Sequence, residues 1–173
     1  VIGTHKSNKP NILKLKRLGI EKKVNLRNMD LGRLKDIQNI FNKYKINEVY
    51  NLASQSYIDK SFYDPIKTSD INAVGVLRLL ETIRSKKYKI KFYQASSSEM
   101  FGNNKNYKQS ETSRFDPQSP YAVSKLYGHF ITKNYRESYN IFAVSGILFN
   151  HESPLRDKKF VTSKVIQGLI DIK

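Results

Sequence analysis

The chain has 173 residues, which is enough for one domain with a hydrophobic core and too few for two domains of ordinary size. It contains no apolar run near the roughly 20 residues needed to cross a bilayer, no cysteine for disulfides or thiolate metal sites, and no secretory signal in its polar, basic opening. We therefore expect a soluble, cytoplasmic protein with no bound metal and no membrane partner.

The formal net charge of +16 raises the question of a nucleic-acid partner. The lysines are nevertheless scattered through every segment, with only short clusters such as KLKR at residues 14–17. This distribution indicates charged surface positions more than a basic groove, so we expect no nucleic-acid binding. The positive field would still favour an anionic small ligand.

Segments with strand-like and helix-like periodicity alternate along the chain. Period-two apolar positions predict a strand at residues 23–30, and helical spacing follows at residues 31–46. The alternation continues with strands expected at 48–54, 90–98 and 141–150 and helices at 69–85, 121–139 and 160–172. This order predicts an α/β fold of the doubly wound class, a Rossmann-like parallel sheet covered on both faces.

Three of the predicted strands run into small or polar residues, at 52–56, 96–99 and 150–152. In open parallel sheets, ligands bind beyond the carboxyl ends of the strands. The three endings therefore predict one crevice in which chemistry should be sought. The polar stretch 101–119 is expected to be a connecting loop beside that crevice.

The stretch SPYAVSKLYGHF sets Tyr121 and Lys125 four residues apart in a predicted helix. Positions i and i+4 share one face, so a phenol base assisted by an ammonium group is possible. The spacing alone does not decide the matter, because about one or two such pairs are expected by chance. Tyr63 and Lys67 form a second pair, in which Pro65 would break a helix unless it stood in the first turn.

Four longer stretches stand in the order YNLASQSYIDKSF (50–62), FYQASSSEMFG (92–102), SPYAVSKLYGHFITKNYRESY (119–139) and GILFNHESPLR (146–156). Together they resemble the extended short-chain dehydrogenase/reductase family. The Ser-x-Glu of the second stretch and the NHESP of the fourth narrow the resemblance to the GDP-mannose 4,6-dehydratases.

The resemblance implies one partial NAD(P)-binding domain over residues 1–173, truncated at both ends, with the start of a substrate-binding region near 150–173. The opening residues VIG would be the tail of a second strand, and the glycine-rich turn that usually binds the pyrophosphate does not occur. Most of the carboxyl-terminal substrate lobe would also be missing. We therefore expect the isolated chain to be weakly active or inactive.

The resemblance also implies catalytic roles. Tyr121 would take the proton of the sugar's 4-hydroxyl while hydride leaves C4, and Lys125 would hold the nicotinamide ribose and lower the pKa of the phenol. Ser97, where relatives usually carry Thr, would bond the substrate oxygen. Glu99 would remove the C5 proton and help to expel the C6 hydroxyl as water.

For the cofactor, the resemblance implies NADP, recycled within each turnover. It places Asp30 and Leu31 at the adenine, and Leu148, Asn150, His151 and Arg156 near the nicotinamide, the substrate and the bound nucleotide. Lys6 stands near an arginine pair that binds the 2′-phosphate in relatives, although the second position is Ser7 here. Phosphates and ribose would be lined by Leu52, Ala53, Ser54, Gln55 and Ser56.

Several of these candidates have simpler interpretations when they are taken alone. Asp30 at a strand end is more often a helix cap, and His151 is more often a hydrogen-bonded structural histidine. The stretch SSSE before MFG could be a plain polar turn, and Arg156, near Asp157 and two lysines, could be solvated surface. What favours function is the joint placement of the candidates at successive strand ends.

The implied function is dehydration of GDP-mannose to GDP-4-dehydro-6-deoxy-mannose, for deoxysugars such as fucose or rhamnose, by a homo-oligomer, either a dimer or a tetramer. The alternatives are another nucleotide-sugar dehydratase, a 4-epimerase, or an inactive binding-only fragment. An epimerase needs no carboxylate at C5, so Glu99 discriminates between the enzymatic alternatives.

Overall fold

The computed structural model describes residues 1–7, 10, 12–103, 108–157 and 160–172. Its strands form two parallel pieces of sheet. β1 (Ile2–His5) pairs with β2 (Asn25–Asn28), and β3 (Glu48–Asn51), β4 (Lys91–Ser97) and β5 (Ala143–Leu148) pair in that order. The parallel α/β class and each predicted strand are confirmed, including the strand that opens the chain.

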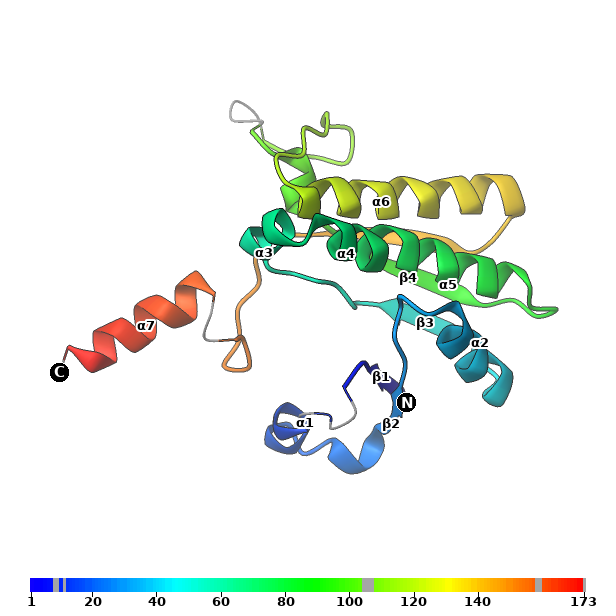
Figure 1. The fold of residues 1–173 in the computed structure, drawn as a ribbon, viewed down its shortest axis with the longest axis horizontal. Coiled ribbons are helices and arrows are strands. Elements are labelled where there is room, and N and C mark those ends of the chain that lie inside the picture. Colours follow the sequence, from blue (N-terminus) through cyan, green and yellow to red (C-terminus); the bar gives the residue numbers. More distant parts are fainter. Residues whose placement is uncertain (8–9, 11, 104–107, 158–159, 173) are drawn as a thin grey trace.

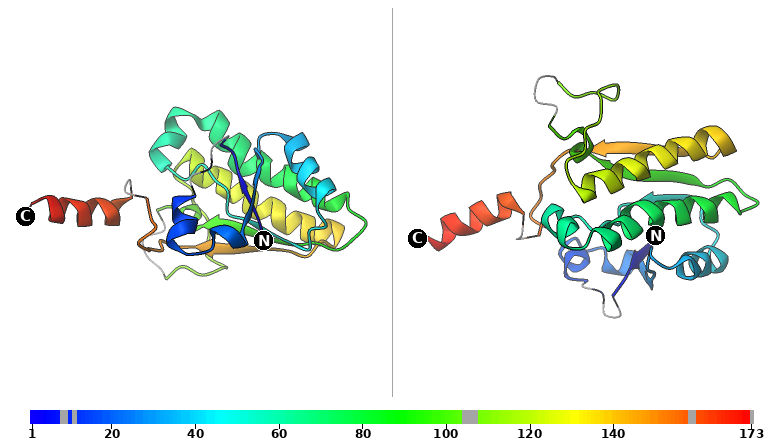
Figure 2. Two further views of the ribbon diagram at one scale, coloured as in Figure 1. Left: turned by 90° about the horizontal axis from the view of Figure 1, so that it is seen from below. Right: turned by 45° about the horizontal axis from the view of Figure 1, so that its top comes forward.

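The helices lie mainly on one side of the three-stranded sheet, where α6 packs on β4 and β5 and also contacts α5 (Figure 1). Helix α7 projects away from the rest of the molecule and has no buried residue (Figures 1 and 2). In the described ranges no helix is both long and apolar enough to span a membrane. The helical segments are α1 (Leu13–Arg17), η1 (Glu21–Lys23), α2 (Leu34–Lys43), α3 (Ile58–Tyr63), α4 (Pro65–Ser69), η2 (Asp70–Val74), α5 (Gly75–Arg84), η3 (Ser98–Phe101), α6 (Pro120–Tyr139) and α7 (Val161–Asp171).

The core lies between the sheet and these helices. It contains Ile37 and Phe41 from α2, Val76 and Leu80 from α5, and Phe92 from β4. Their helical or alternating spacing in the sequence gives each element one apolar side. Burial of such a side chain stabilises the fold by about 1.5–3 kcal/mol relative to exposure, which holds the strand ends in place.

The other face of the three-stranded sheet is open in the described part of the chain. Tyr50 on β3 is 66% exposed and Val144 on β5 is 40% exposed. Both residues alternate with inward-facing neighbours, as a strand requires. The second helical layer expected of a doubly wound sheet is therefore not found among the described residues.

The second Tyr-Lys pair does not share a helix face. Helix α3 ends at Tyr63, and Pro65 is the first residue of α4. The side chain of Asp64 caps α4 by accepting a hydrogen bond of 3.3 Å from the amide of Lys67. Proline suits this first position because its missing N–H would have no helical partner there.

Helix α6 begins with a similar cap that places Tyr121 in its first turn. The Ser119 side chain accepts a hydrogen bond of 3.0 Å from the amide of Ala122, and Pro120 is the first helical residue. The helix ends at Asn140 in the left-handed conformation. Tyr121 and Lys125 both lie on its buried side.

Gly102 fixes the turn after η3, close to the loop that precedes α6. Its φ is +56°, and a Cβ there would lie 1.6 Å from the carbonyl oxygen of Asp116. Asp116 is held by its amide, which donates a hydrogen bond of 2.9 Å to the carbonyl of Met100. We expect Gly102→Ala to lower the free energy of unfolding by about 2–4 kcal/mol, measured by denaturant titration of the full-length protein.

Gly19→Ala is the matched control for this prediction. Gly19 also has a positive φ, of +64°, but no heavy atom lies within 4 Å of the position that a Cβ would take there. This variant therefore suffers only the conformational cost, about 1–2 kcal/mol. Equal losses in the two variants would contradict the proposed clash with Asp116.

Candidate active site

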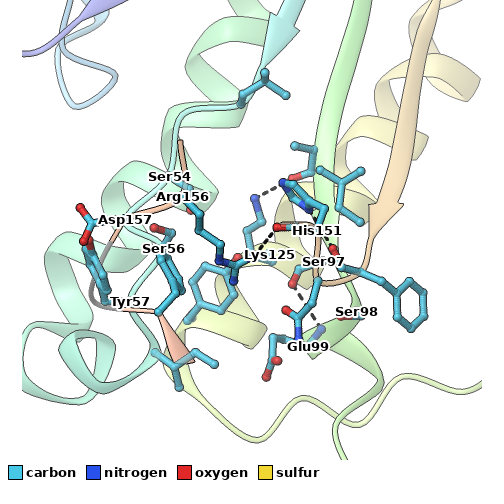
Figure 3. Close-up of a pocket in the computed structure, with 18 of the residues that line it drawn as sticks. Ser54, Ser56, Tyr57, Ser97, Ser98, Glu99, Lys125, His151, Arg156 and Asp157 are labelled. Atoms are coloured by element: carbon cyan, nitrogen blue, oxygen red, sulfur yellow. Dashed lines mark hydrogen bonds between the residues drawn. The ribbon is translucent and has the colours of Figure 1, made fainter. Parts of the chain in front are cut away.

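The ends of β3, β4 and β5 open into one cavity of about 940 Å³ (Figure 3). The sheet order makes these three strands neighbours, so their carboxyl ends meet at one edge. The predicted crevice is therefore confirmed. Among the predicted site residues, those lining it are Leu52, Ser54, Ser56, Ser97, Glu99, Tyr121, Lys125, Leu148, Asn150, His151 and Arg156.

Tyr121 presents its phenol to this cavity from the start of α6. Burial raises the pKa of the phenol above its usual value, and the nearby charge of Glu99 acts in the same direction. Side-chain hydrogen bonds from Ser97 and Ser54 oppose this rise. Two hydroxyl groups therefore stabilise the phenolate form, one from the end of β4 and one from the segment after β3.

Lys125 lies one turn further along α6 and is 4% exposed. Its Nζ donates a hydrogen bond of 2.6 Å to the carbonyl of Ala95 and lies 6.0 Å from the centroid of the Tyr121 ring. Burial lowers its pKa to about 8. The same carbonyl also accepts a bond of 3.1 Å from Gln94, whose side chain is held by Asn51 at 2.8 Å.

Ser97 and Glu99 stand where β4 turns into η3. The Ser97 hydroxyl caps η3 by accepting a hydrogen bond of 3.2 Å from the amide of Glu99. Ser97 is buried, whereas Glu99 is exposed at the rim of the cavity. A carboxylate thus stands beside two hydroxyl groups and an ammonium group in one cavity.

Asn72 lies outside the cavity lining but supports it, and sequence reasoning missed this residue. It is 2% exposed in η2, a turn of π-helix between α4 and α5. Its Oδ1 accepts bonds from the Gln55 amide at 2.8 Å and from Ser54 Oγ at 3.1 Å, and its Nδ2 donates to the Gln55 carbonyl at 3.0 Å. This one side chain fixes the segment after β3, and π-turns often occur at functional sites.

Arg156 marks the side of the cavity formed by the segment after β5. Its Nη1 lies 3.1 Å from Glu152, and its guanidinium stacks 4.3 Å from the centroid of the Phe160 ring. Phe160 in turn stacks on Tyr57, and neither ring was predicted to belong to the site. Among the residues that the structure describes, the buried Nε of Arg156 has no hydrogen-bond partner, which fits an anionic ligand.

Five predicted site residues lie outside the cavity lining: Lys6, Asp30, Leu31, Ala53 and Gln55. Leu31 is a core residue.

Lys6 Nζ and Asp30 form an ion pair of 2.9 Å at the ends of β1 and β2. Burial would raise the pKa of Asp30, but the Gly32 amide and Lys6 lower it below its usual value. Helix α2 begins without a side-chain cap, so Asp30 is not its cap.

The described residues contain no group of three or more histidine, aspartate and glutamate side chains placed to hold a metal ion. The chemical groups that line the cavity are carboxylates, phenols, hydroxyls and cations. Such a set can move protons at a bound anionic substrate.

The chain resembles proteins of one family along its whole length. The family model for GDP-mannose 4,6 dehydratase matches residues 1–173. Over 145 residues the chain is 50% identical to GDP-mannose 4,6-dehydratase of Vibrio cholerae, and over 148 residues it is 49% identical to GDP-mannose 4,6 dehydratase 1 of Arabidopsis thaliana. These alignments cover 83% of this chain but 39% and 41% of the two relatives, so the chain spans about two fifths of their length.

Two solved structures share the fold. UDP-N-acetylglucosamine 4-epimerase from Methanobrevibacter ruminantium superposes with a TM-score of 0.86 at 24% identity, covering 99% of this chain and 55% of that one. The dTDP-glucose 4,6-dehydratase of Streptomyces venezuelae gives 0.83 at 18% identity, covering 98% and 52%. The sequence match over all 173 residues is the more specific finding, and it shows that the chain belongs to the GDP-mannose 4,6-dehydratase family.

Proposed function

We propose that the full-length protein is a lyase that dehydrates GDP-mannose to GDP-4-dehydro-6-deoxy-mannose, in the formation of GDP-deoxysugars. The observation that carries the proposal is that Glu99 lies in the same cavity as Tyr121, Lys125 and Ser97. A 4-epimerase would need the tyrosine and the lysine but no acid-base group for C5. Two relatives that are 49–50% identical to this chain over most of its length are named as dehydratases of this sugar nucleotide.

The side chains divide the proton transfers between them. Tyr121 takes the proton of the 4-hydroxyl, and the hydroxyl of Ser97 bonds the same sugar oxygen. Glu99 then removes the C5 proton, which the new ketone at C4 has made acidic, and passes it to the C6 hydroxyl, which leaves as water. Glu99 stands exposed at the rim of the cavity. A bound nicotinamide cofactor would supply the oxidation at C4 and the compensating reduction at C6.

The experiment that tests the function is incubation of the full-length protein with GDP-mannose and NADP. We expect a product lighter by one water, without accumulation of reduced cofactor. No loss of water, with cofactor still bound, would overturn the assignment in favour of an epimerase or a binding-only protein. Because this chain spans under half of its relatives, we also propose that it is weakly active or inactive when isolated.

We propose NADP as the cofactor, held along residues 52–56 and by Lys125, His151 and Arg156. Solved proteins of this fold are described with NADPH and with NAD. At a strand end, an acid usually bonds the ribose hydroxyls of NAD, whereas a cation accommodates the 2′-phosphate of NADP. The ion pair of Lys6 with Asp30 places a cation beside that acid, which supports NADP.

Lys6→Ala is expected to weaken NADP binding by about tenfold and NAD binding much less, because only NADP carries the phosphate. The dissociation constants of both cofactors can be measured by protein fluorescence. Lys35→Ala is the control variant. It also removes one lysine charge, but on the exposed side of α2 and not at the ion pair. Equal losses for NADP and NAD in the Lys6 variant would remove Lys6 from phosphate recognition.

We further propose a cytoplasmic homo-oligomer, either a dimer or a tetramer. Apolar side chains on the outer face of α6 support self-association, since Val123, Tyr127 and Phe130 are 54%, 42% and 49% exposed. Light scattering of the full-length protein should give a mass of two or four chains. A monomer mass at micromolar concentration would contradict this proposal.

A further inference from the structure

Strand β4 extends beyond the end of its neighbour β3 and leaves a backbone carbonyl at that edge. The amide of Lys91 donates a bond of 2.9 Å to the residue before β3, so Ala95, four residues later, also turns its backbone groups toward β3. The last pair of the two strands is Asn51 with Gln94, and the amide of Leu52 turns back to its own segment at 3.2 Å. The carbonyl of Ala95 therefore lies past the end of the paired segment, where side chains can bond it.

Two side-chain donors share this carbonyl. Lys125 Nζ donates at 2.6 Å and Gln94 Nε2 donates at 3.1 Å. A carbonyl oxygen has two lone pairs, so the two bonds use both of them. Lys125 and Ala95 line the cavity, whereas Gln94 lies outside the lining. The lysine therefore bonds the side of the oxygen that faces the cavity.

The orientation of the Gln94 amide follows from its partners. A carbonyl can only accept, so the NH₂ group of Gln94 must face Ala95 and its Oε1 must face away. That oxygen accepts a bond of 2.8 Å from Asn51 Nδ2. Gln94 thus presents a donor at the oxygen that Lys125 bonds, and its own acceptor is already occupied by Asn51.

Burial holds this arrangement in place. Gln94 is 1% exposed and Asn51 is 5% exposed, so an amide that left its bonds would become an unpaired buried polar group. Helix α6 packs on β4 at this point (Figure 1). Gly128 follows Lys125 by three residues on the same helix face, and a Cβ there would lie 3.6 Å from Gln94 Nε2. The glycine lets the helix lie close to the amide.

We propose that Gln94 is a positioning residue for the reaction, which occupies one lone pair of the Ala95 carbonyl and confines the ammonium group of Lys125 to the other, on the side of the cavity. This inference rests on the proposed function, in which Lys125 holds the nicotinamide ribose. An ammonium group has three N–H donors, so one is used on Ala95 and two remain for the ribose hydroxyls. Without the Gln94 amide the flexible lysine can take either lone pair, and the fraction of molecules ready to bind the ribose falls.

The test compares Gln94→Met in the full-length protein with the same change in a Lys125→Met background. Methionine is about as long as glutamine but has no amide. We expect NADP to bind about tenfold more weakly when Lys125 is present, and less than about twofold more weakly when it is absent, because the effect passes through the lysine. The affinity for adenosine 2′,5′-bisphosphate, which lacks the nicotinamide ribose, should stay the same. Calorimetric titration gives both dissociation constants.

Two further variants separate this role from a loss of stability. Asn51→Leu combined with Gln94→Met replaces both amides by apolar groups, so neither is left unpaired, and it should weaken NADP binding to the same extent. This pair reports on the role even where Gln94→Met alone does not fold. Thr132→Val removes a buried hydroxyl that bonds the carbonyl of Gly128 at 2.7 Å on the same helix, and should leave NADP affinity unchanged.

The outcomes distinguish the role of Gln94 from the proposed function. An equal loss of NADP affinity in the two Lys125 backgrounds, or a matching loss for adenosine 2′,5′-bisphosphate, would overturn the role of Gln94. Unchanged NADP affinity in the Gln94 variants would do the same. Failure to remove water from GDP-mannose, with the dependence on Lys125 present, would overturn only the proposed function. No binding of NADP to the unaltered protein would overturn both.

Discussion

Tyr121→Phe is expected to lower kcat for the dehydration of GDP-mannose by about 10³-fold or more. Removal of the phenol oxygen leaves no group to accept the 4-hydroxyl proton, and general-base groups of this kind contribute about 10²–10⁴. The neighbouring hydroxyls of Ser97 and Ser54 cannot replace it, because serine hydroxyls do not ionise near neutral pH. The rate of appearance of the dehydrated nucleotide, followed by mass, measures the loss.

Two further observations separate chemistry from folding in this variant. The phenyl ring keeps the packing of a residue that is 9% exposed, so the thermal midpoint and NADP affinity should stay near those of the unaltered protein. Tyr127→Phe, on the same helix but 42% exposed, should retain full activity. Retained turnover in Tyr121→Phe would exclude Tyr121 as the base.

Much of the fold could be predicted from local patterns. The apolar spacing in α2, α5 and α6 sets which side of each helix is buried, and small or polar residues mark the strand ends. Parallel pairing then brings these ends to one edge, so the cavity follows from the order of elements. The four-residue spacing of Tyr121 and Lys125 likewise required only a helix.

Contacts between distant segments could not be predicted in this way. Lys125 bonds the carbonyl of Ala95, 30 residues earlier, and Asn72 in the π-turn η2 bonds Ser54, 18 residues earlier. Neither spacing nor propensity encodes such a turn. The stack of Phe160 on Tyr57 similarly joins residues about a hundred positions apart.

Glu99→Gln is the variant with the most specific expected effect. The amide has the size of the carboxylate but cannot take the C5 proton, so water loss should fall by about 10²–10⁴ while NADP affinity is unchanged. Exchange of the C5 hydrogen with solvent deuterium, read by mass, should stop to the same extent. Glu111→Gln, on the exposed loop before α6, makes the same substitution away from the cavity and should have no effect.

The two variants should fail at different steps. Tyr121→Phe blocks oxidation at C4, so the C5 hydrogen never becomes acidic and no reduced cofactor forms. Glu99→Gln leaves Tyr121, Lys125 and Ser97 in place, so the first step should still proceed and reduced cofactor should accumulate at about one equivalent per site in a single turnover. Unaltered water loss in Glu99→Gln would remove Glu99 from the mechanism, and with it the reason to prefer a dehydratase over an epimerase at this cavity.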